Sequence, residues 1–438
     1  MLYQTLSAPI SCQIELTTSC NHNCSHCYNF WRKDLKRDDT SFTKTTISQI
    51  VKKLEDAKVF DIIITGGEPL MSYDVLIHCI KEAQRAGLGV SLNSNLVPLT
   101  RSRARELRSM GVRQILTSLM GPSAEIHDSL AQSKGSFDRV VRKIRLAQEE
   151  GIRVAVNMVV SRANRIVVRD TARLVSSLGV KMFTATKAGC PGNCQDFSEF
   201  SLSKTEFRQY LVDLQEIGGE LNLKIDALEG YPLCGIGDLD LHYLFIGRKC
   251  FAGVTTMTVA SDGEVRPCSH LDISYGNLLR EELSKIWMRM SDWRDGTYLP
   301  EVCKICKLLP ACGGGCRMEA KMASGSLNGE DPYSSPGSVD ESLSSLQVHR
   351  ARMPKEGKKE GKVVSFEIRP YRHRPEPFGV TVLAGKSRAF LSLAGFEVLK
   401  QFQLGIPYFL RDEGIRWGSL DPATFIGGLI KRGIAVEK

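Results

Sequence analysis

The chain lacks the features that send proteins into membranes or out of the cell. Its first residues, MLYQTLSAPISCQIEL, contain no basic segment followed by an apolar one, so they do not predict a signal peptide. No run approaches the roughly 20 apolar residues that a membrane-spanning helix needs. From these absences we expect a cytoplasmic protein that has no membrane partner.

Motifs of nucleic-acid-binding modules are also missing, although the formal net charge is +9. The basic runs RKDLKR and KEGKKEGK are interleaved with acidic residues, which is typical of a solvated surface. An acidic peptide or a phosphate-bearing partner is the alternative explanation of the charge. We expect no nucleic-acid partner.

Cysteine is abundant, with 14 residues, and its distribution is uneven. Disulfides would explain so many cysteines in a secreted protein, whereas clustered spacings in a cytosolic protein indicate metal binding or catalysis. Cys12 and Cys79 have the surroundings of core residues. Nine others form two groups, which argues against incidental use: Cys20, Cys24 and Cys27, and then Cys250, Cys268, Cys303, Cys306, Cys312 and Cys316.

A length of 438 residues allows two to four domains of about 100–200 residues each. Strand and helix patterns alternate over residues 11–200, which predicts parallel strands joined by right-handed crossovers. A barrel and an open doubly wound sheet both fit this pattern, and we expect a partial (β/α)6 barrel of the TIM type. The six expected strands lie at 12–18, 61–67, 89–95, 113–121, 153–160 and 180–188. Ligand residues should follow their carboxyl ends.

The remaining sequence suggests three further regions. Residues 201–322 contain a hairpin turning at 261–263 and a cysteine-rich segment that would need metal to fold. Residues 323–364 are rich in Gly, Ser, Pro and charge, which predicts a flexible linker. Residues 365–438 look globular, with a hairpin turning at 384–386 and two amphipathic helices.

The first cysteine group has three thiols in a C-x3-C-x2-C run directly after the first strand. Structural zinc takes four ligands, and His22 or His26 would complete a zinc set. Three thiolates can instead hold three irons of a cubane and leave the fourth iron open. The next strand ends in GGEP, residues 66–69, where adjacent glycines permit close backbone approach and Glu68 offers an acceptor for an ammonium group.

Together these two motifs resemble those of the radical S-adenosylmethionine (radical SAM) enzymes. The resemblance implies that Cys20, Cys24 and Cys27 hold a [4Fe–4S] cluster whose open iron is chelated by S-adenosylmethionine. The reduced cluster then cleaves this cofactor to a 5′-deoxyadenosyl radical, which abstracts hydrogen from a substrate. Residues that the resemblance places around the cofactor are Gly66, Gly67, Glu68, Pro69, Asn93, Asn95 and Ser118.

The resemblance extends to HDSLAQSKGSFD, residues 127–138, which is similar to the family's HD…RG…GSF stretch. Ala131 and Gln132 stand where the family has Arg and Gly, so a carboxylate-binding Arg must come from elsewhere or is absent. No catalytic acid or base is identified by the resemblance.

The second cysteine group resembles the SPASM extension, which carries two auxiliary [4Fe–4S] clusters; a zinc-ribbon-like site is the alternative. The resemblance implies one cluster on Cys303, Cys306 and Cys312 and the other on Cys250, Cys268 and Cys316. The first of these lacks the family's downstream cysteine, because Ser334 stands at that position.

Several residues remain as candidates for the missing ligands. Ser334 or Asp331 would complete the first set through oxygen, or that site is open or lost. Cys234 is a candidate fourth ligand of the second set or a buried free cysteine. Cys190 and Cys194 follow the sixth strand, either as incidental loop residues or in a catalytic role.

The last 74 residues resemble the winged-helix-like, PqqD-like RiPP recognition element, which binds the leader of a ribosomal precursor peptide. The resemblances together imply a radical SAM oxidoreductase that modifies a precursor peptide, for example by a thioether or carbon–carbon crosslink, with ferredoxin or flavodoxin as electron donor. The alternatives are an enzyme acting on a small molecule such as a tetrapyrrole, and an electron-transfer module without chemistry of its own.

Overall fold

The computed structural model describes residues 3–29, 40–112, 114–190, 197–246, 248–352, 365–409 and 415–437. The chain divides into two compact units. The first comprises Met1–Tyr3 and Ala8–Met353, and the second comprises Gln4–Ser7 and Pro354–Lys438. In the described part of the chain, no helix is both long and apolar enough to cross a membrane.

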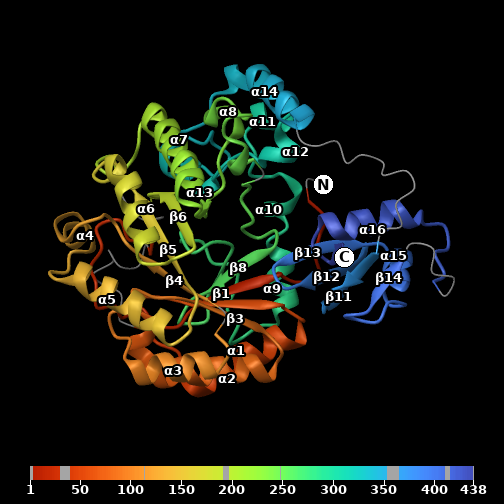
Figure 1. Cartoon of the computed structure of the whole chain (residues 1–438), viewed down its shortest axis with the longest axis horizontal. Helices are drawn as coiled ribbons and strands as arrows, with labels where there is room; N and C mark the ends of the chain where they lie inside the picture. Colours follow the sequence, from red (N-terminus) through yellow and green to blue (C-terminus); the bar gives the residue numbers. More distant parts are fainter. Residues whose placement is uncertain are drawn as a thin grey trace. The chain divides into compact units, whose positions relative to one another are not determined.

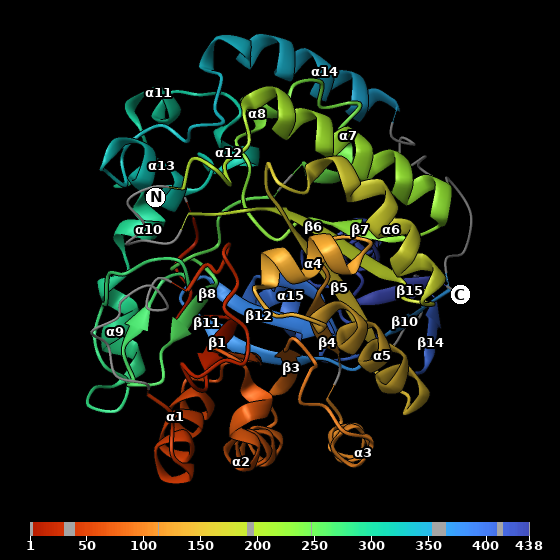
Figure 2. The same ribbon diagram turned by 90° about the vertical axis from the view of Figure 1, so that its left-hand side faces the viewer.

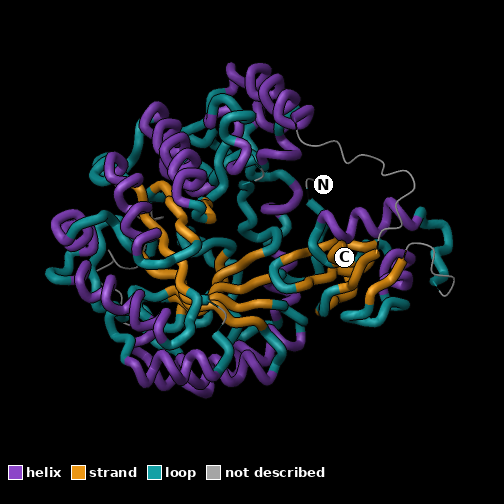
Figure 3. The backbone as a smooth tube through the Cα atoms, in the orientation of Figure 1, coloured by secondary structure: helices purple, strands orange, loops and turns teal. Residues whose placement is uncertain are grey.

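The first unit is built on one nine-stranded sheet with the order β7-β6-β5-β4-β3-β2-β1-β8-β9. Figure 3 shows the strands in orange with helices around them in purple. All its pairings are parallel except β8 with β9. The strands are β1 (Ser11–Glu15), β2 (Asp61–Thr65), β3 (Gly89–Asn93), β4 (Ile115–Ser118), β5 (Val154–Val160), β6 (Met182–Lys187), β7 (Lys224–Asp226), β8 (Thr256–Val259) and β9 (Val265–Arg266). Because β1 to β6 are neighbours in chain order, the sheet winds in one direction, as in a barrel, and the predicted parallel α/β core is confirmed.

Helices connect these strands along the outer side of the sheet (Figure 1 and Figure 2). They are α1 (Lys44–Asp56), α2 (Tyr73–Arg85), α3 (Arg101–Ser109), α4 (Ala124–Ala131), α5 (Ser136–Glu149) and α6 (Val168–Ser177), with 3-10 turns η2 (Pro69–Ser72) and η3 (Arg165–Val167). The first helix shows why they form. A capping box of Thr43 and Thr46 starts α1, and its buried side chains at Ile47, Ile50 and Leu54 make one apolar stripe.

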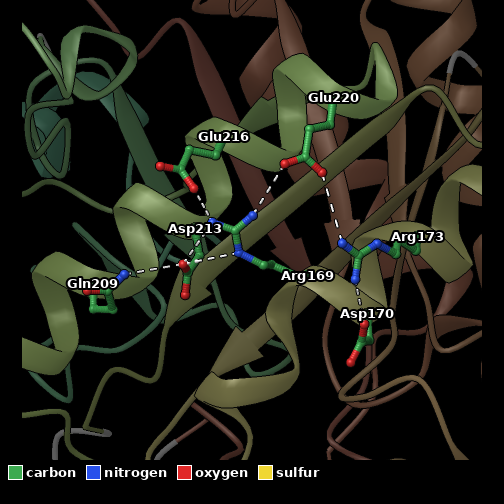
Figure 4. Close-up of polar contacts among 7 residues, drawn as sticks. All are labelled: Arg169, Asp170, Arg173, Gln209, Asp213, Glu216 and Glu220. Atoms are coloured by element: carbon green, nitrogen blue, oxygen red, sulfur yellow. Dashed lines mark hydrogen bonds and ion pairs between the residues drawn. The ribbon is translucent and has the colours of Figure 1, made fainter.

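A network of ion pairs joins α6 to α7 (Lys204–Leu221), the helix that leads out of the core (Figure 4). Arg169 pairs with Asp213 at 3.2 Å and Glu220 at 3.5 Å, and it also contacts Glu216. Arg173 extends the network to Glu220 at 4.0 Å. Because several charges share one surface, these pairs fix the packing of α7 better than an isolated pair would.

The cysteine-rich region packs as short elements after α7. They are α8 (Leu233–Ile236), η4 (Tyr243–Phe245), α9 (Leu283–Arg289), α10 (Asp292–Asp295), α11 (Glu301–Lys304), α12 (Leu309–Cys312) and α13 (Arg317–Ser324). The predicted hairpin is the β8–β9 pair, whose turn contains Gly263 at φ +89°.

Residues 323–352 differ from the linker that the composition predicts over 323–364. They belong to the first unit and form η5 (Pro336–Ser338) and α14 (Val339–Arg352). Tyr333 and Leu346 are buried in the main hydrophobic core and anchor this segment. The rest of the predicted linker, residues 353–364, lies outside the described residues.

The second unit has two antiparallel three-stranded sheets. One has the order β14-β10-β15 and the other β11-β12-β13. Its elements are β10 (Ser365–Ile368), β11 (Arg372–Glu376), β12 (Gly379–Ala384), β13 (Ser387–Leu391), α15 (Leu393–Leu399), β14 (Pro407–Phe409), α16 (Pro422–Lys431) and β15 (Ala435–Glu437). The expected hairpin is β12–β13, in which Ala384 pairs with Ser387, and the two expected helices are α15 and α16.

Candidate functional site

The loop with Cys20, Cys24 and Cys27 leaves the carboxyl end of β1 and rests on the carboxyl end of α4. The Asn23 amide donates to the Ala131 carbonyl at 3.3 Å, and the Ser25 amide donates to the Leu130 carbonyl at 3.0 Å. The three cysteines are partly exposed residues. The loop is therefore held by backbone bonds from its intervening residues, Asn23 and Ser25.

The start of the cysteine loop lies directly against Gly66 and Gly67, the two glycines that follow β2. The Gly67 amide donates to the Thr17 carbonyl at 2.6 Å, and the Glu68 amide donates to the Ser19 carbonyl at 2.8 Å. A Cβ on Gly67 would lie 2.1 Å from the Ser19 oxygen. A Cβ on Gly66, whose φ is +134°, would lie 2.4 Å from the Thr17 oxygen. Glycine is therefore required here for the loop itself to reach its position.

The Glu68 carboxylate is fully buried and accepts three hydrogen bonds from the protein. Its donors are the Leu70 amide at 3.0 Å, the Ser94 hydroxyl at 2.7 Å and the Asn95 amide at 2.7 Å. Burial raises the pKa of Glu68 to about 7, although these hydrogen bonds oppose the shift. Glu68, which the sequence predicts to bind an ammonium group, thus links the end of β2 to the turn after β3.

The polar residues expected near the cofactor share the edge where β1 to β4 end. Asn93 is the last residue of β3, and Ser118 is the last residue of β4. Asn95 reaches the cysteine loop directly, because its side-chain amide donates to the Asn21 Oδ1 atom at 2.7 Å. Since the strands are parallel, their carboxyl ends and the cysteine loop lie together, as a ligand site in an α/β fold requires.

The HD…GSF stretch braces the cysteine loop through a buried chain of hydrogen bonds. The Ser136 hydroxyl lies 3.0 Å from His22 Nε2 and 3.2 Å from His127 Nε2. His127 Nδ1 accepts from the Met120 amide at 3.1 Å, so its Nε2 carries the proton and donates to Ser136. Burial lowers the pKa of His22, His26 and His127 to about 4, so all three imidazoles are neutral at pH 7.

The departure from the family's pattern at Gln132 has a backbone consequence. Gln132 ends α4 in the left-handed conformation, with φ +47°, where glycine is the favoured residue. Its side-chain carbonyl accepts from the Asn23 amide group at 3.4 Å. Gln132 therefore contributes a contact to the cysteine loop that glycine cannot make, while Ala131 beside it is buried and carries no charge.

A buried ion cluster lies at the end of β6 and was not anticipated from the sequence. The Lys187 ammonium is 2.7 Å from Glu319 and 3.0 Å from Glu229, and it stands 5.0 Å from the centre of the Tyr333 ring. Lys187 is completely buried. The one signal in the sequence was a lysine at the carboxyl end of an apolar strand.

Glu319 and Tyr333 also line a cavity of about 480 Å³. Cys190, Phe197 and Lys204 contribute to its wall. A volume of this size is typical of a small-ligand site. Cys190 is thus placed beside the cavity, whereas Cys194 lies outside the described residues.

The first cysteine loop and the second cysteine group are connected. The Tyr28 ring, next to Cys27, stacks on His270 with ring centres 4.9 Å apart. The His270 amide donates to the Cys268 sulfur at 3.4 Å. The two groups thus belong to one continuous structure.

The chemistry of the donors fits iron–sulfur clusters. Burial raises the pKa of Cys268 and of Cys303 to about 12. These thiols therefore stay protonated at neutral pH unless a bound metal displaces the proton. Within the described ranges no three Cys, His, Asp or Glu side chains converge closely enough to hold a single metal ion. Ligands of a cubane bind separate irons and do not need to converge in this way.

Comparison with known families agrees with this geometry. Residues 14–175 match the family described as the radical SAM superfamily. Residues 250–307 match SPASM, described as an iron–sulfur cluster-binding domain. The first match includes the cysteine loop, GGEP and the polar strand ends. Cys234, Cys312 and Cys316 lie outside the second.

Three curated relatives cover about three quarters of the chain. The AdoMet-dependent heme synthase of Methanosarcina barkeri is 26% identical, covering 75% of this chain and 96% of the relative. The mycofactocin maturase MftC of Mycolicibacterium smegmatis is 29% identical over 75% of this chain and 83% of its own. The PqqA peptide cyclase of Ruegeria pomeroyi is 26% identical over 76% and 88%.

The fold is also that of a solved structure. Streptococcus suis SuiB bound to S-adenosylmethionine superposes with a TM-score of 0.60, at 17% identity, covering 74% of this chain and 76% of that one.

Proposed function

Because the chain is a radical SAM enzyme with a SPASM iron–sulfur domain, and its cofactors are [4Fe–4S] clusters and S-adenosylmethionine, we propose that it modifies a ribosomally made precursor peptide. When bound, the cluster and S-adenosylmethionine supply a 5′-deoxyadenosyl radical that abstracts hydrogen from the substrate. Two of the relatives described above are named as a maturase and a peptide cyclase.

The roles proposed for the first site follow from its geometry. Cys20, Cys24 and Cys27 hold the cluster from a loop whose other residues are fixed by α4 and α5. The backbone of residues 66–69, together with Asn93, Asn95 and Ser118, receives S-adenosylmethionine at the shared strand edge. Glu68 positions this edge by holding the ends of β2 and β3 together.

The cavity beside Glu319 is the proposed place of the substrate. Its volume of about 480 Å³ suits one or two side chains of a peptide. Lys187 neutralises part of the buried charge of Glu319 and Glu229 and so keeps the wall of the cavity in place. The proposed modification is a crosslink within the peptide, such as a thioether or carbon–carbon bond.

The observation that carries the peptide proposal is the second folded unit. Its strand β13 pairs only with β12 among the described residues, so one edge of that sheet is unpaired there. Phe390 in β13 is 38% exposed, and Leu393 just after it is 67% exposed. An unpaired strand edge flanked by exposed apolar side chains is suited to binding an extended peptide as an added strand. We propose that this unit is a PqqD-like RiPP recognition element and binds the leader there.

Cellular context completes the proposal. The protein acts in the cytoplasm with ferredoxin or flavodoxin as electron donor. Clustered C-x2-C spacings such as Cys24–Cys27 and Cys303–Cys306 support this, because they are typical of metal binding in cytosolic proteins.

The experiment uses the full-length, anaerobically reconstituted enzyme and short peptides encoded beside its gene. Binding is measured by fluorescence anisotropy, and turnover by 5′-deoxyadenosine and by the mass of the peptide. We expect one peptide to bind and change mass. We expect Phe390→Arg to weaken its binding at least tenfold, whereas Phe409→Arg, at an exposed position on the other sheet, leaves binding unchanged.

A second candidate function is supported by the heme synthase relative, of which the chain covers 96%. In that case a tetrapyrrole replaces the peptide as substrate. Formation of 5′-deoxyadenosine that depends on a tetrapyrrole, with no response to any neighbouring peptide, would establish this candidate and overturn the peptide proposal.

A further inference from the structure

The six cysteines of the second group separate into two sets in space. Cys250, Cys268 and Cys316 are the inner set. Cys303, Cys306 and Cys312 form an outer set around a different pocket. The outer pocket holds none of the inner thiols.

Three consecutive glycines separate Cys312 from Cys316. Gly313, Gly314 and Gly315 have φ values of +73°, +87° and +77°, all in the left-handed region. A Cβ on Gly315 would lie 2.6 Å from Asp331 Oδ2. These three glycines in the left-handed region turn the chain, so that Cys312 belongs to the outer set and Cys316 to the inner set.

The outer pocket contains a fourth thiol, that of Cys234. Cys234 lines this pocket together with Cys303, Cys306 and Cys312. The amide of the preceding residue, Leu233, donates to the Cys312 sulfur at 3.3 Å. Two successive residues of α8 therefore face the outer set.

Backbone contacts of Gly235 hold α8 close to the outer set. A Cβ on Gly235 would lie 1.9 Å from the Tyr333 carbonyl oxygen, so only glycine permits this contact. The Gly235 carbonyl accepts from Arg208 Nε of α7 at 2.8 Å. The Ser335 amide donates to the Cys234 sulfur at 3.4 Å, and such N–H···S bonds are common on cluster ligands. Arg208 thus holds the backbone of α8, and the Ser335 amide contacts the thiol itself.

The oxygen donors that the sequence offers for this position are already engaged. Both oxygens of Asp331 accept backbone amides, from Tyr333 at 2.9 Å and from Cys316 at 2.8 Å. The Ser334 hydroxyl lies 3.3 Å from Glu330 Oε2. Thiolate sulfur is also the ligand that iron–sulfur clusters prefer.

We propose that Cys234 is the fourth ligand of the outer cluster, so that Cys234, Cys303, Cys306 and Cys312 bind one [4Fe–4S] cubane. A cubane with four cysteine ligands has no open iron for a substrate. The outer cluster therefore cannot bind substrate, and Cys234 is unavailable to the inner set. This assignment is independent of which substrate the enzyme modifies.

The test is alkylation of thiols by iodoacetamide under anaerobic conditions, read by mass spectrometry on the full-length holoenzyme. Three proteins are compared: the parent, Cys303→Ala/Cys306→Ala, which loses the outer cluster, and Cys250→Ala/Cys268→Ala, which loses the inner one. Cys79, buried in the main core, reports whether each protein stays folded.

We expect Cys234 to be protected in the parent and in the inner-set variant, and to become at least tenfold more reactive in the outer-set variant. Reactivity in the parent, or protection lost only in the inner-set variant, would overturn the assignment.

A second measurement needs no double variant. After mild oxidation, a cluster with an open iron converts to a three-iron cluster that is detected by electron paramagnetic resonance. Cys234→Ala should give one additional three-iron cluster per chain relative to the parent, whereas Cys79→Ala should give the parent amount. Equal amounts in Cys234→Ala and the parent would rule the assignment out.

Discussion

Substituting Gly67 by alanine should detach the cysteine loop from the sheet. The added Cβ would lie 2.1 Å from the Ser19 oxygen, 2.6 Å from the Ser19 carbonyl carbon and 2.7 Å from the Thr18 oxygen. Ordinary contact begins at 3.4 Å, so the two backbones must separate by about 1.3 Å. Backbone atoms cannot rotate away as a flexible side chain can.

The cost can be estimated from the bonds that hold this contact. The two backbone hydrogen bonds from Gly67 and Glu68 to the loop would be stretched beyond useful length, at about 1 kcal/mol each. Two bonds at about 1 kcal/mol each give a loss of about 2 kcal/mol, which lies within the range of about 1–3 kcal/mol that overpacking usually costs. We therefore expect the free energy of unfolding to fall by about 2 kcal/mol. The displaced Ser19 adjoins Cys20, so the reconstituted protein should also lose about four irons, one cubane.

The assay is urea denaturation of the protein together with iron and sulfide analysis after anaerobic reconstitution. Gly219→Ala is the matched control, because a Cβ there meets no atom within 4 Å and the residue lies in α7. This control should gain about 0.5–1 kcal/mol, the usual helix preference for alanine. Parent-like stability and iron content in Gly67→Ala would refute the reasoning.

Three further substitutions test the surroundings of the site. Ser136→Ala removes the hydroxyl that lies between two buried imidazoles and should cost about 1–3 kcal/mol of stability in urea denaturation, whereas Ser177→Ala on the surface should cost little. Lys187→Met leaves two carboxylates buried together and should cost about 3–5 kcal/mol, against almost nothing for the exposed Lys52→Met; similar losses in both would refute the role of the ion cluster. Because burial raises the pKa of Glu68 from 4.5 to about 7, its contribution to stability is complete below pH 4.5 and declines as the pH rises to about 7. The stability of Glu68→Gln, measured across this range, should therefore improve relative to the parent with rising pH, and parallel pH profiles would contradict the shift.

The parts of the fold that the sequence predicted are those encoded locally. Apolar runs such as Val154–Val160 predicted buried parallel strands, and β1 to β7 lie in the sheet in chain order. The cysteine loop and GGEP predicted a shared site because each follows a strand end. Short-range patterns of this kind can be recognised in the sequence without knowledge of the tertiary structure.

The parts that could not be predicted depend on distant residues. The ion cluster brings together Lys187, Glu229 and Glu319, which are separated by as many as 132 residues in the sequence. No local sequence pattern indicates that these residues are in contact. The segment at 323–352 has the composition of a linker. Its polar residues nevertheless bond to the core, as Asp331 does, and two apolar anchors hold it there. Composition reports how much apolar surface a segment has, but not whether its few apolar residues have a place to bind.

The position of α8 beside Cys312 has a consequence for the unfolded chain. A cluster that bridges Cys234 and Cys312 closes a loop of roughly eighty residues, and closure of a long loop removes much of the conformational entropy of the disordered state. Iron would therefore act on this region as a disulfide acts in a secreted protein. Loss of the outer cluster would free α8 and the cysteine-rich segment together, and both would become more sensitive to proteases.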